Sequence, residues 1–230
     1  FLESVNAGSG EIRIKSTSGT AITLGTLAGA GLDISLTDLG NLSAASTTFE
    51  TIGTDDITIS GITTTATANT GLVSLVSGNT IRFTGNSAFT NGLSGAAQEE
   101  IIVDSAVSLD SNGSGMTLIA DDKLTILANA DLLGNGGNIT LTGKGLSNAG
   151  SGVEVQPADG GSADLAQATT TTIATNGTGT ITITGTGGLL TNTSNSGVVI
   201  GRERDDAVLT DGDANSILIS TASGKITLNG

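Results

Sequence analysis

The stretch Ile181-Thr182-Ile183-Thr184-Gly185 decides the fold class, because it alternates aliphatic and hydroxyl residues and then ends on glycine. Alternation with a period of two is typical of a β-strand with one buried face. The same pattern recurs at 57–61, 81–85 and 139–143, with looser copies at 22–25 and 226–230. Repetition at intervals of tens of residues predicts an architecture whose units bury their apolar faces against each other.

A second signature, glycine followed by aliphatic positions, comes after the motif beyond a polar stretch of variable length, as at 71–75, 152–155 and 197–200. Motif starts at 139, 181 and 226 lie 42 and 45 residues apart. Turns of variable length between fixed strands favour a β-solenoid over a sandwich or a barrel. We therefore predict an all-β, right-handed parallel β-helix with roughly three strands per rung, each rung about 25 to 30 residues long.

The predicted solenoid is a single segment over residues 1–230, with less regular repeats over 1–119 and clearer ones over 120–230. At about 4.8 Å per rung, on the order of eight or nine rungs make a rod about 40 Å long. Neither end shows a polar cap, and the last motif copy starts a new rung. We expect that the rod either continues in the same long polypeptide or stacks end to end on another copy through the strand edges of its terminal rungs.

The charge and composition of the chain exclude several classes of function. With 22 acidic and 8 basic residues the net charge is −14, which argues against binding to nucleic acid or to an anionic membrane surface. The chain has no cysteine, and no apolar run approaches the length that spans a bilayer. It begins at Phe1 without the pattern of a signal peptide, which indicates a processed product or a segment of something longer.

Two stretches carry a resemblance to a known class of repeats. Residues 179–188, Gly-Thr-Ile-Thr-Ile-Thr-Gly-Thr-Gly-Gly, with 195–200, Asn-Ser-Gly-Val-Val-Ile, resemble the β-strand repeats of filamentous haemagglutinin-like bacterial surface proteins, and 137–143 is similar to the same repeat. The resemblance covers 120–230 well and 1–119 loosely. It implies a long right-handed β-helix, exported across the outer membrane and used as an adhesin, a filament or a matrix component.

The loop 211–216, Asp-Gly-Asp-Ala-Asn-Ser, is the sharpest candidate for a metal site. Asp211, Asp213 and Asn215 place oxygen ligands at alternate positions, as in the first half of a Ca²⁺ loop. The loop departs from an EF-hand, which requires Gly at its sixth position where this chain has Ser216, and the repeated pattern of Ca²⁺-binding β-rolls is missing. The alternative is an ordinary polar turn without metal. No other cofactor is predicted.

Acidic doublets precede several strands and admit two interpretations. They can form a cation-binding or catalytic carboxylate edge, as in β-helix enzymes that act on polysaccharides, or they can keep strand edges from aggregating. The sequence favours the second, because no basic residue stands consistently beside them and the chain has no His for acid–base chemistry. The charged cluster 202–206 is interpreted as a solvated loop. The doublets are Asp55-Asp56, Glu99-Glu100, Asp121-Asp122 and Asp205-Asp206.

Outward Thr residues suggest a flat binding face. In 181–185 the two Thr side chains point away from the core, with hydroxyls about 7 Å apart on strands stacked about 4.8 Å apart. Ice-binding solenoids use flat arrays of this kind. Arg13 and Arg82, however, stand at the motif position that Thr58 and Thr182 occupy, and we expect them to interrupt the face.

These observations predict a non-enzymatic structural and adhesive protein, extracellular or at a bacterial cell surface, that forms a stiff rod and stacks into a filament or matrix fibre. Glycans or a host or cell surface are its expected partners. Two alternatives stay open. A ligand-binding module for glycan or ice would show an outward Thr plane over two rungs unbroken by Arg. A β-helix enzyme that degrades polysaccharide would show Asp residues of adjacent rungs converging in a cleft with Lys or Arg.

Calcium binding at Asp211, Asp213 and Asn215 has a direct test. A ligand that binds only the folded chain stabilises it by mass action, so a chelator should lower the melting temperature if the loop holds Ca²⁺. The variant Asp213→Asn should melt at the chelated temperature with or without added Ca²⁺. A melting temperature that the chelator leaves unchanged would exclude the site.

Overall fold

A computed structural model describes residues 3–26, 29, 31–145, 151–156, 170–187, 196–201 and 216–230. Within these residues the chain is nearly all β, with one short helix, and its strand pairs are parallel. The prediction of an all-β fold with parallel strands is therefore confirmed.

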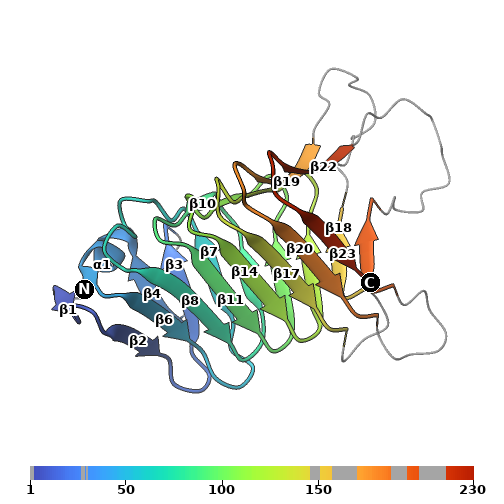
Figure 1. Cartoon of the computed structure of the whole chain (residues 1–230). Coiled ribbons are helices and arrows are strands. Elements are labelled where there is room, and N and C mark those ends of the chain that lie inside the picture. Colours follow the sequence, from blue (N-terminus) through green and yellow to red (C-terminus); the bar gives the residue numbers. More distant parts are fainter. Residues whose placement is uncertain are drawn as a thin grey trace, which may run out of the picture.

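Three parallel sheets form the body of the described structure (Figure 1), and we call them the first, second and third sheets in the order in which the chain visits them. The first sheet has eight strands: β2 (Glu11–Lys15), β6 (Ser46–Glu50), β8 (Leu72–Ser77), β11 (Leu93–Ala97), β14 (Met116–Ala120), β17 (Ile139–Gly143), β20 (Ile181–Gly185) and β23 (Ile226–Asn229). The second also has eight: β4 (Gly31–Ser35), β3 (Ala21–Gly25), β7 (Ile57–Ser60), β9 (Ile81–Phe83), β12 (Glu100–Val103), β15 (Lys123–Ile126), β18 (Val153–Val155) and β21 (Val198–Ile200). The third has five: β10 (Ser87–Ala88), β13 (Ser108–Asp110), β16 (Asp131–Leu133), β19 (Thr170–Thr175) and β22 (Ser216–Thr221). A two-stranded sheet pairs β1 (Val5–Asn6) with β5 (Leu42–Ser43), and α1 (Leu36–Gly40) lies between β4 and β5 in the chain.

From β8 onward the chain visits the first, second and third sheets in turn. Each of these strands pairs with the strand one circuit earlier, except β10, which begins the third sheet. We call one such circuit a rung. The first-sheet strands β8, β11, β14 and β17 begin 21, 23 and 23 residues apart, so these rungs are shorter than expected. The next two intervals, from β17 to β20 and from β20 to β23, are 42 and 45 residues.

Copies of the alternating motif stack in register, but on two different sheets. In the first sheet Ile139 pairs with Ile181, which pairs with Ile226. In the second sheet Ile57 pairs with Ile81. The motif therefore does not mark one fixed side of a rung, because alternation specifies a half-buried strand and not its place in the circuit.

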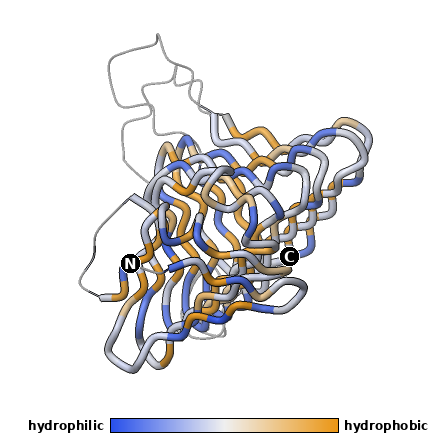
Figure 2. Tube along the Cα trace, turned by 90° about the vertical axis from the view of Figure 1, so that its left-hand side faces the viewer, coloured by the Kyte–Doolittle hydropathy of each residue, from blue (hydrophilic) through white to orange (hydrophobic). Residues whose placement is uncertain are grey.

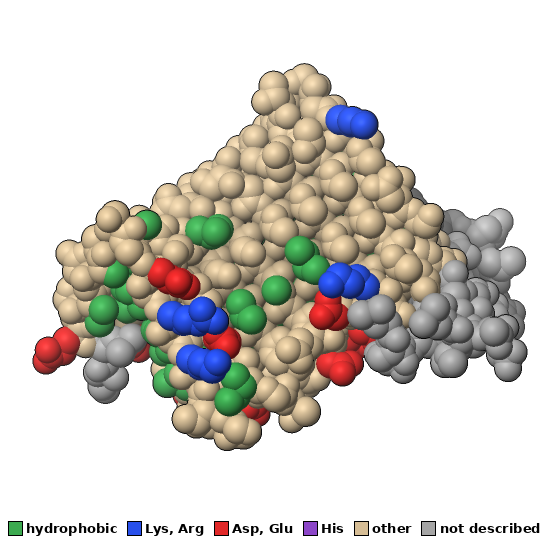
Figure 3. Space-filling model, turned by 60° about the horizontal axis from the view of Figure 1, so that its bottom comes forward, with side chains coloured by type: hydrophobic (Ala, Val, Ile, Leu, Met, Phe, Trp, Pro, Cys, Tyr) green, Lys and Arg blue, Asp and Glu red, His purple; other side chains and the backbone are tan. Residues whose placement is uncertain are grey.

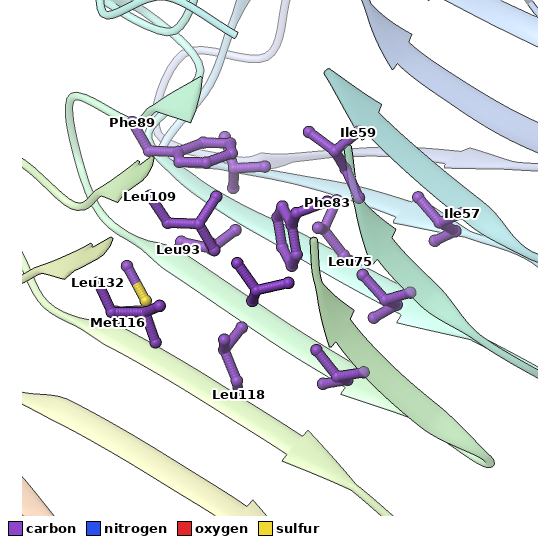
Figure 4. Close-up of a cluster of buried hydrophobic side chains, with 14 of the residues drawn as sticks. Ile57, Ile59, Leu75, Phe83, Phe89, Leu93, Leu109, Met116, Leu118 and Leu132 are labelled. Carbon is purple, nitrogen blue, oxygen red and sulfur yellow. The ribbon is translucent and has the colours of Figure 1, made fainter. Parts of the chain in front are cut away.

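The hydrophobic core is shared by all three sheets and collects the inward side chains of successive rungs. Along β17 and β20, buried Ile and Leu residues alternate with half-exposed Thr residues. Viewed from the N-terminal side, the turns of the chain lie behind one another, with hydrophobic and hydrophilic residues alternating along them (Figure 2). Phe83 and Phe89 are 0% and 1% exposed and pack among aliphatic side chains such as Leu75 and Leu93 (Figure 4).

Close backbone contacts explain why glycine ends the motif and begins the second signature. A Cβ on Gly143 would lie 1.8 Å from the carbonyl oxygen of Gly152, and a Cβ on Gly185 would lie 1.7 Å from that of Gly197. Each pair joins the last residue of a first-sheet strand to the residue just before a second-sheet strand. Without side chains, the two backbones can meet at this corner whatever the length of the connection between them.

The N-terminal end of the core is covered, which differs from the expectation of an uncapped end. β4 extends the second sheet beyond β3, and α1 follows at the same end of the molecule (Figure 1). The helix begins with a capping box, in which the Ser35 side chain accepts a hydrogen bond from the Asp38 N–H and the Asp38 carboxylate accepts one from the Ser35 N–H. Leu39 and Leu42 are each 1% exposed and belong to the core.

The C-terminal end of the described structure is open. Ile226 and Leu228 occupy inward positions in register with Ile181 and Ile183, which are fully buried. They are nevertheless 41% and 50% exposed, because β23 is the last strand of the first sheet. The described strands thus leave apolar side chains and a row of unpaired backbone groups at this end.

The paired glycines can be tested by substitution. Gly143→Ala should lower the free energy of unfolding by about 1–3 kcal/mol, because the new Cβ would overlap the Gly152 carbonyl and force the corner apart. Gly40→Ala is the matched control, since a Cβ there would meet no atom within 4 Å. Urea unfolding measures both variants, and equal stabilities for the two would contradict the explanation.

Candidate functional site

The acidic doublets come together at one edge of the molecule. Asp55-Asp56, Glu99-Glu100 and Asp121-Asp122 each lie where the chain passes from a first-sheet strand to a second-sheet strand. We call these segments the acidic turns. Backbone hydrogen bonds join successive turns, from the Asp122 N–H to the Glu99 carbonyl at 2.9 Å and from the Glu99 N–H to the Asn79 carbonyl at 3.0 Å. The fourth doublet, Asp205-Asp206, lies outside the described residues.

Several carboxylates of the acidic turns bind neighbouring turns. The Asp56 Oδ1 accepts hydrogen bonds from the Asn79 side chain at 2.8 Å and from the Thr80 N–H at 3.1 Å. The Asp55 carboxylate accepts one from the Gly19 N–H at 2.8 Å. Over the part of the chain that the structure describes, no group of three or more acidic side chains is close enough to hold a metal ion. The visible role of these carboxylates is to tie one rung to the next.

Ion pairs between rungs add to these ties. Glu50 pairs with both Arg13 and Lys15 of the preceding first-sheet strand. Hydrogen bonds from Lys15 and then from Arg13 hold the pKa of Glu50 below its usual value. Further pairs across rungs join Arg82 to Asp104, Lys123 to Glu154 and Lys144 to Asp121.

A shallow groove of about 240 Å³ runs beside the acidic turns. Outward Val76, Ala96 and Ile119, which stand in register on three successive strands, form its apolar part. Glu50 and Asp121 also line it, but both are already paired with basic side chains. The groove therefore does not bring unpaired acids together with a base, as acid–base catalysis on a polysaccharide would require.

The outer face of the first sheet carries a continuous column of hydroxyl side chains. Consecutive strands from β6 to β23 place Ser or Thr at the same outward register position, and apart from Thr48, which is buried, these side chains are half-exposed. A second column beside it is also hydroxylic or amidic in the last three strands, with Thr142, Thr184 and Asn229. We call these two columns the hydroxyl face. Its first column is Thr48, Ser74, Ser94, Thr117, Thr140, Thr182 and Thr227.

The expectation that arginine interrupts this face is wrong for Arg82. Arg82 pairs with Thr58 on the second sheet, so it does not lie on the first sheet at all. Arg13 does stand in the first column, but only on β2, beyond Thr48 at the N-terminal end. Figure 3 shows most of the charged side chains of this view in its lower half, one Lys or Arg side chain near the upper edge, and a largely uncharged surface between them.

The candidate Ca²⁺ ligands Asp211, Asp213 and Asn215 lie outside the described residues, as does the charged cluster 202–206. The prediction of a metal site there stays a prediction. Among the residues that the structure describes, no helix has the length and apolar character needed to cross a membrane.

Comparison with protein-family models, with curated proteins and with solved structures gave no match.

Sequence reasoning missed most of the first hydroxyl column. Ser74 and Ser94 lie in strands without the full motif, and only the strand pairing aligns them with Thr140 and Thr182. The available signal was the alternation itself, since every second residue of β8, β14 and β17 is buried. That signal says that a residue points outward but not which residue lies beside it in the next rung.

The ion pairs of Glu50 predict a dependence of stability on pH. Because the folded pKa is lowered, the pairing stabilises the fold above the unfolded pKa of about 4.3 and is lost as the pH falls through the folded value. Glu50→Gln should therefore lower the melting temperature at about pH 7 and remove part of its decline towards about pH 3. The control is Glu99→Gln, which changes an exposed carboxylate in an acidic turn. Identical pH profiles for Glu50→Gln and the parent chain would contradict this role.

Proposed function

We propose that this chain is a segment of right-handed parallel β-helix that works as a non-enzymatic structural rod, extracellular or at a bacterial cell surface. The observation that carries the proposal is the unbroken register of the first sheet, in which eight parallel strands stack over one hydrophobic core. Such a stack transmits load through backbone hydrogen bonds and core packing along its whole length. The resemblance of 179–188 and 195–200 to repeats of bacterial surface proteins supports the same assignment.

Right-handed winding is supported by a general rule. Connections between parallel strands are right-handed in about 98% of cases, because strand twist favours that sense of crossing. The net charge of −14 favours solubility of the rod in a crowded extracellular medium. Ties between rungs, such as the hydrogen bonds of Asp56 to Asn79 and Thr80, add to its stiffness.

The open C-terminal end supports stacking. Ile226 and Leu228 present apolar surface beside unpaired backbone groups, whereas the N-terminal edge strand β2 carries Glu11, Arg13 and Lys15. Charges on an edge strand discourage pairing, and their lack on β23 leaves that edge competent to pair. A second copy of this chain is the partner that we propose for this end.

A second candidate function is ligand binding, and the hydroxyl face favours it. In β17 and β20 the outward Thr side chains form a plane over two rungs, and no Arg interrupts it. Such a plane is the feature expected of a ligand-binding module. Glycan and ice are its two candidate ligands. A rod that carries such a face can be both a structural element and an adhesive one.

Stacking is tested by blocking the open end. Concentrated parent protein should associate end to end, as seen by light scattering and electron microscopy, and Leu228→Lys should reduce association by placing a charge on the apolar end. Leu72→Lys is the matched control, because Leu72 is similarly exposed at 41% but lies within the first sheet. Monomeric parent protein at high concentration would contradict stacking.

Small-angle scattering from dilute samples tests the rod separately, and a spherical particle would contradict the rod.

A further inference from the structure

We propose that the hydroxyl face is an ice-binding surface, whose ligand is the ordered layer of water molecules at an ice crystal. This inference rests on the second candidate function above, and it names the ligand of that face. It follows from the spacing, the chemistry and the surroundings of the two columns.

The strand pairing arranges the hydroxyl groups in a two-dimensional lattice. In β17, Thr140 and Thr142 are two residues apart, and they pair with Thr182 and Thr184 of β20. Neighbours within a strand are therefore about 7 Å apart, and neighbours between strands about 4.8 Å apart. Both spacings are close to repeats between oxygen atoms on planes of ice. The lattice continues through Thr227 of β23 in one direction and Thr117 of β14 in the other.

Each side chain in the lattice suits ordered water. A Thr hydroxyl donates one hydrogen bond and accepts two, so it can take the place of a water molecule at the edge of an ice layer. Its methyl group fills the space between hydroxyls without binding liquid water strongly. Packing fixes the Thr side chains, which are only half-exposed over the buried residues Leu141 and Ile183. A face that is rigid before binding loses little conformational entropy when ice adds to it.

Charged groups are excluded from both columns in the strands that would bind. From β8 to β23 the first column holds only Ser and Thr, and the second holds Val76, Ala96, Ile119, Thr142, Thr184 and Asn229. Ionised side chains would hold their own strongly bound water and disturb the lattice. The nearest described ion pairs to these strands lie at their margins. Glu50 holds the second-column position on β6, one strand before β8, where it pairs with Arg13 and Lys15 of β2. Lys144 follows the last residue of β17 and pairs with Asp121 of an acidic turn.

The same surface lacks what a glycan site needs. Sugar rings bind through stacking on aromatic side chains, and the chain contains no Trp or Tyr. The described Phe residues, Phe49, Phe83 and Phe89, are at most 1% exposed. A repeated row of identical weak contacts, in contrast, matches a ligand that is itself a repeating crystal, and its affinity grows with the number of rungs engaged.

The experiment measures thermal hysteresis and the shape of ice crystals grown in the purified full chain. The parent protein should separate the freezing and melting temperatures and facet the crystals. Thr182→Lys should lose this activity, because it puts a charged side chain in the middle of the lattice. Thr58→Lys is the matched control, since Thr58 holds the same motif position on the second sheet, and it should retain the activity. Circular dichroism confirms that each variant is folded, and Thr140→Lys replaces Thr182→Lys if the latter does not fold.

Each outcome decides the inference. A folded parent chain without hysteresis overturns it but leaves the rod proposal intact, because scattering tests the rod independently. Activity that survives in folded Thr182→Lys and Thr140→Lys also overturns it, since the active surface then lies elsewhere. Retention of the parent chain on insoluble polysaccharide, lost in Thr182→Lys and without any effect on ice, replaces the ice ligand with a glycan.

Discussion

In-register pairing between parallel strands of successive rungs is the interaction on which the rest of the structure depends. Ile139, Ile181 and Ile226 meet only because their strands pair without a shift. A slip of one residue would turn every inward side chain of a strand to solvent and bring Thr residues into the core. The apolar core, the hydroxyl columns and the ion pairs between rungs are therefore three consequences of one alignment.

The corners of the rungs protect that alignment. Gly143 with Gly152, and Gly185 with Gly197, bring two backbones closer than any Cβ would allow. The strand that leaves the first sheet and the strand that enters the second are thus fixed relative to each other, regardless of the residues inserted between them. This explains how the connection from the first to the second sheet can grow from 2 residues between β14 and β15 to 9 residues between β17 and β18 while the strand register is kept. Because inserted residues add little loop-closure entropy, such growth costs the fold little.

The sequence predicted the all-β class and the parallel pairing, since period-two alternation and a repeat interval are both visible in a single chain. It did not place each motif copy on its sheet, because Ile57-Thr58-Ile59 and Ile181-Thr182-Ile183 look alike locally and differ only in their position along a circuit. That error moved Arg82 onto the wrong face. The N-terminal cap was also missed, because α1 is five residues long and too short to show helical periodicity. The pairing of Ser35 with Asp38 was the local signal for it.

The distribution of charge follows from the same geometry. Turns and edge strands are where water can reach the backbone, and the chain places Asp55, Asp121 and the charged residues of β2 there. The middle of the first sheet needs no charge for solubility, because Ser and Thr hydroxyls satisfy water while their small side chains stack. Each added rung then contributes one more set of interstrand hydrogen bonds and one more row of hydroxyl groups. Stability and the area of the hydroxyl face consequently rise together, so lengthening the rod strengthens both of its proposed functions.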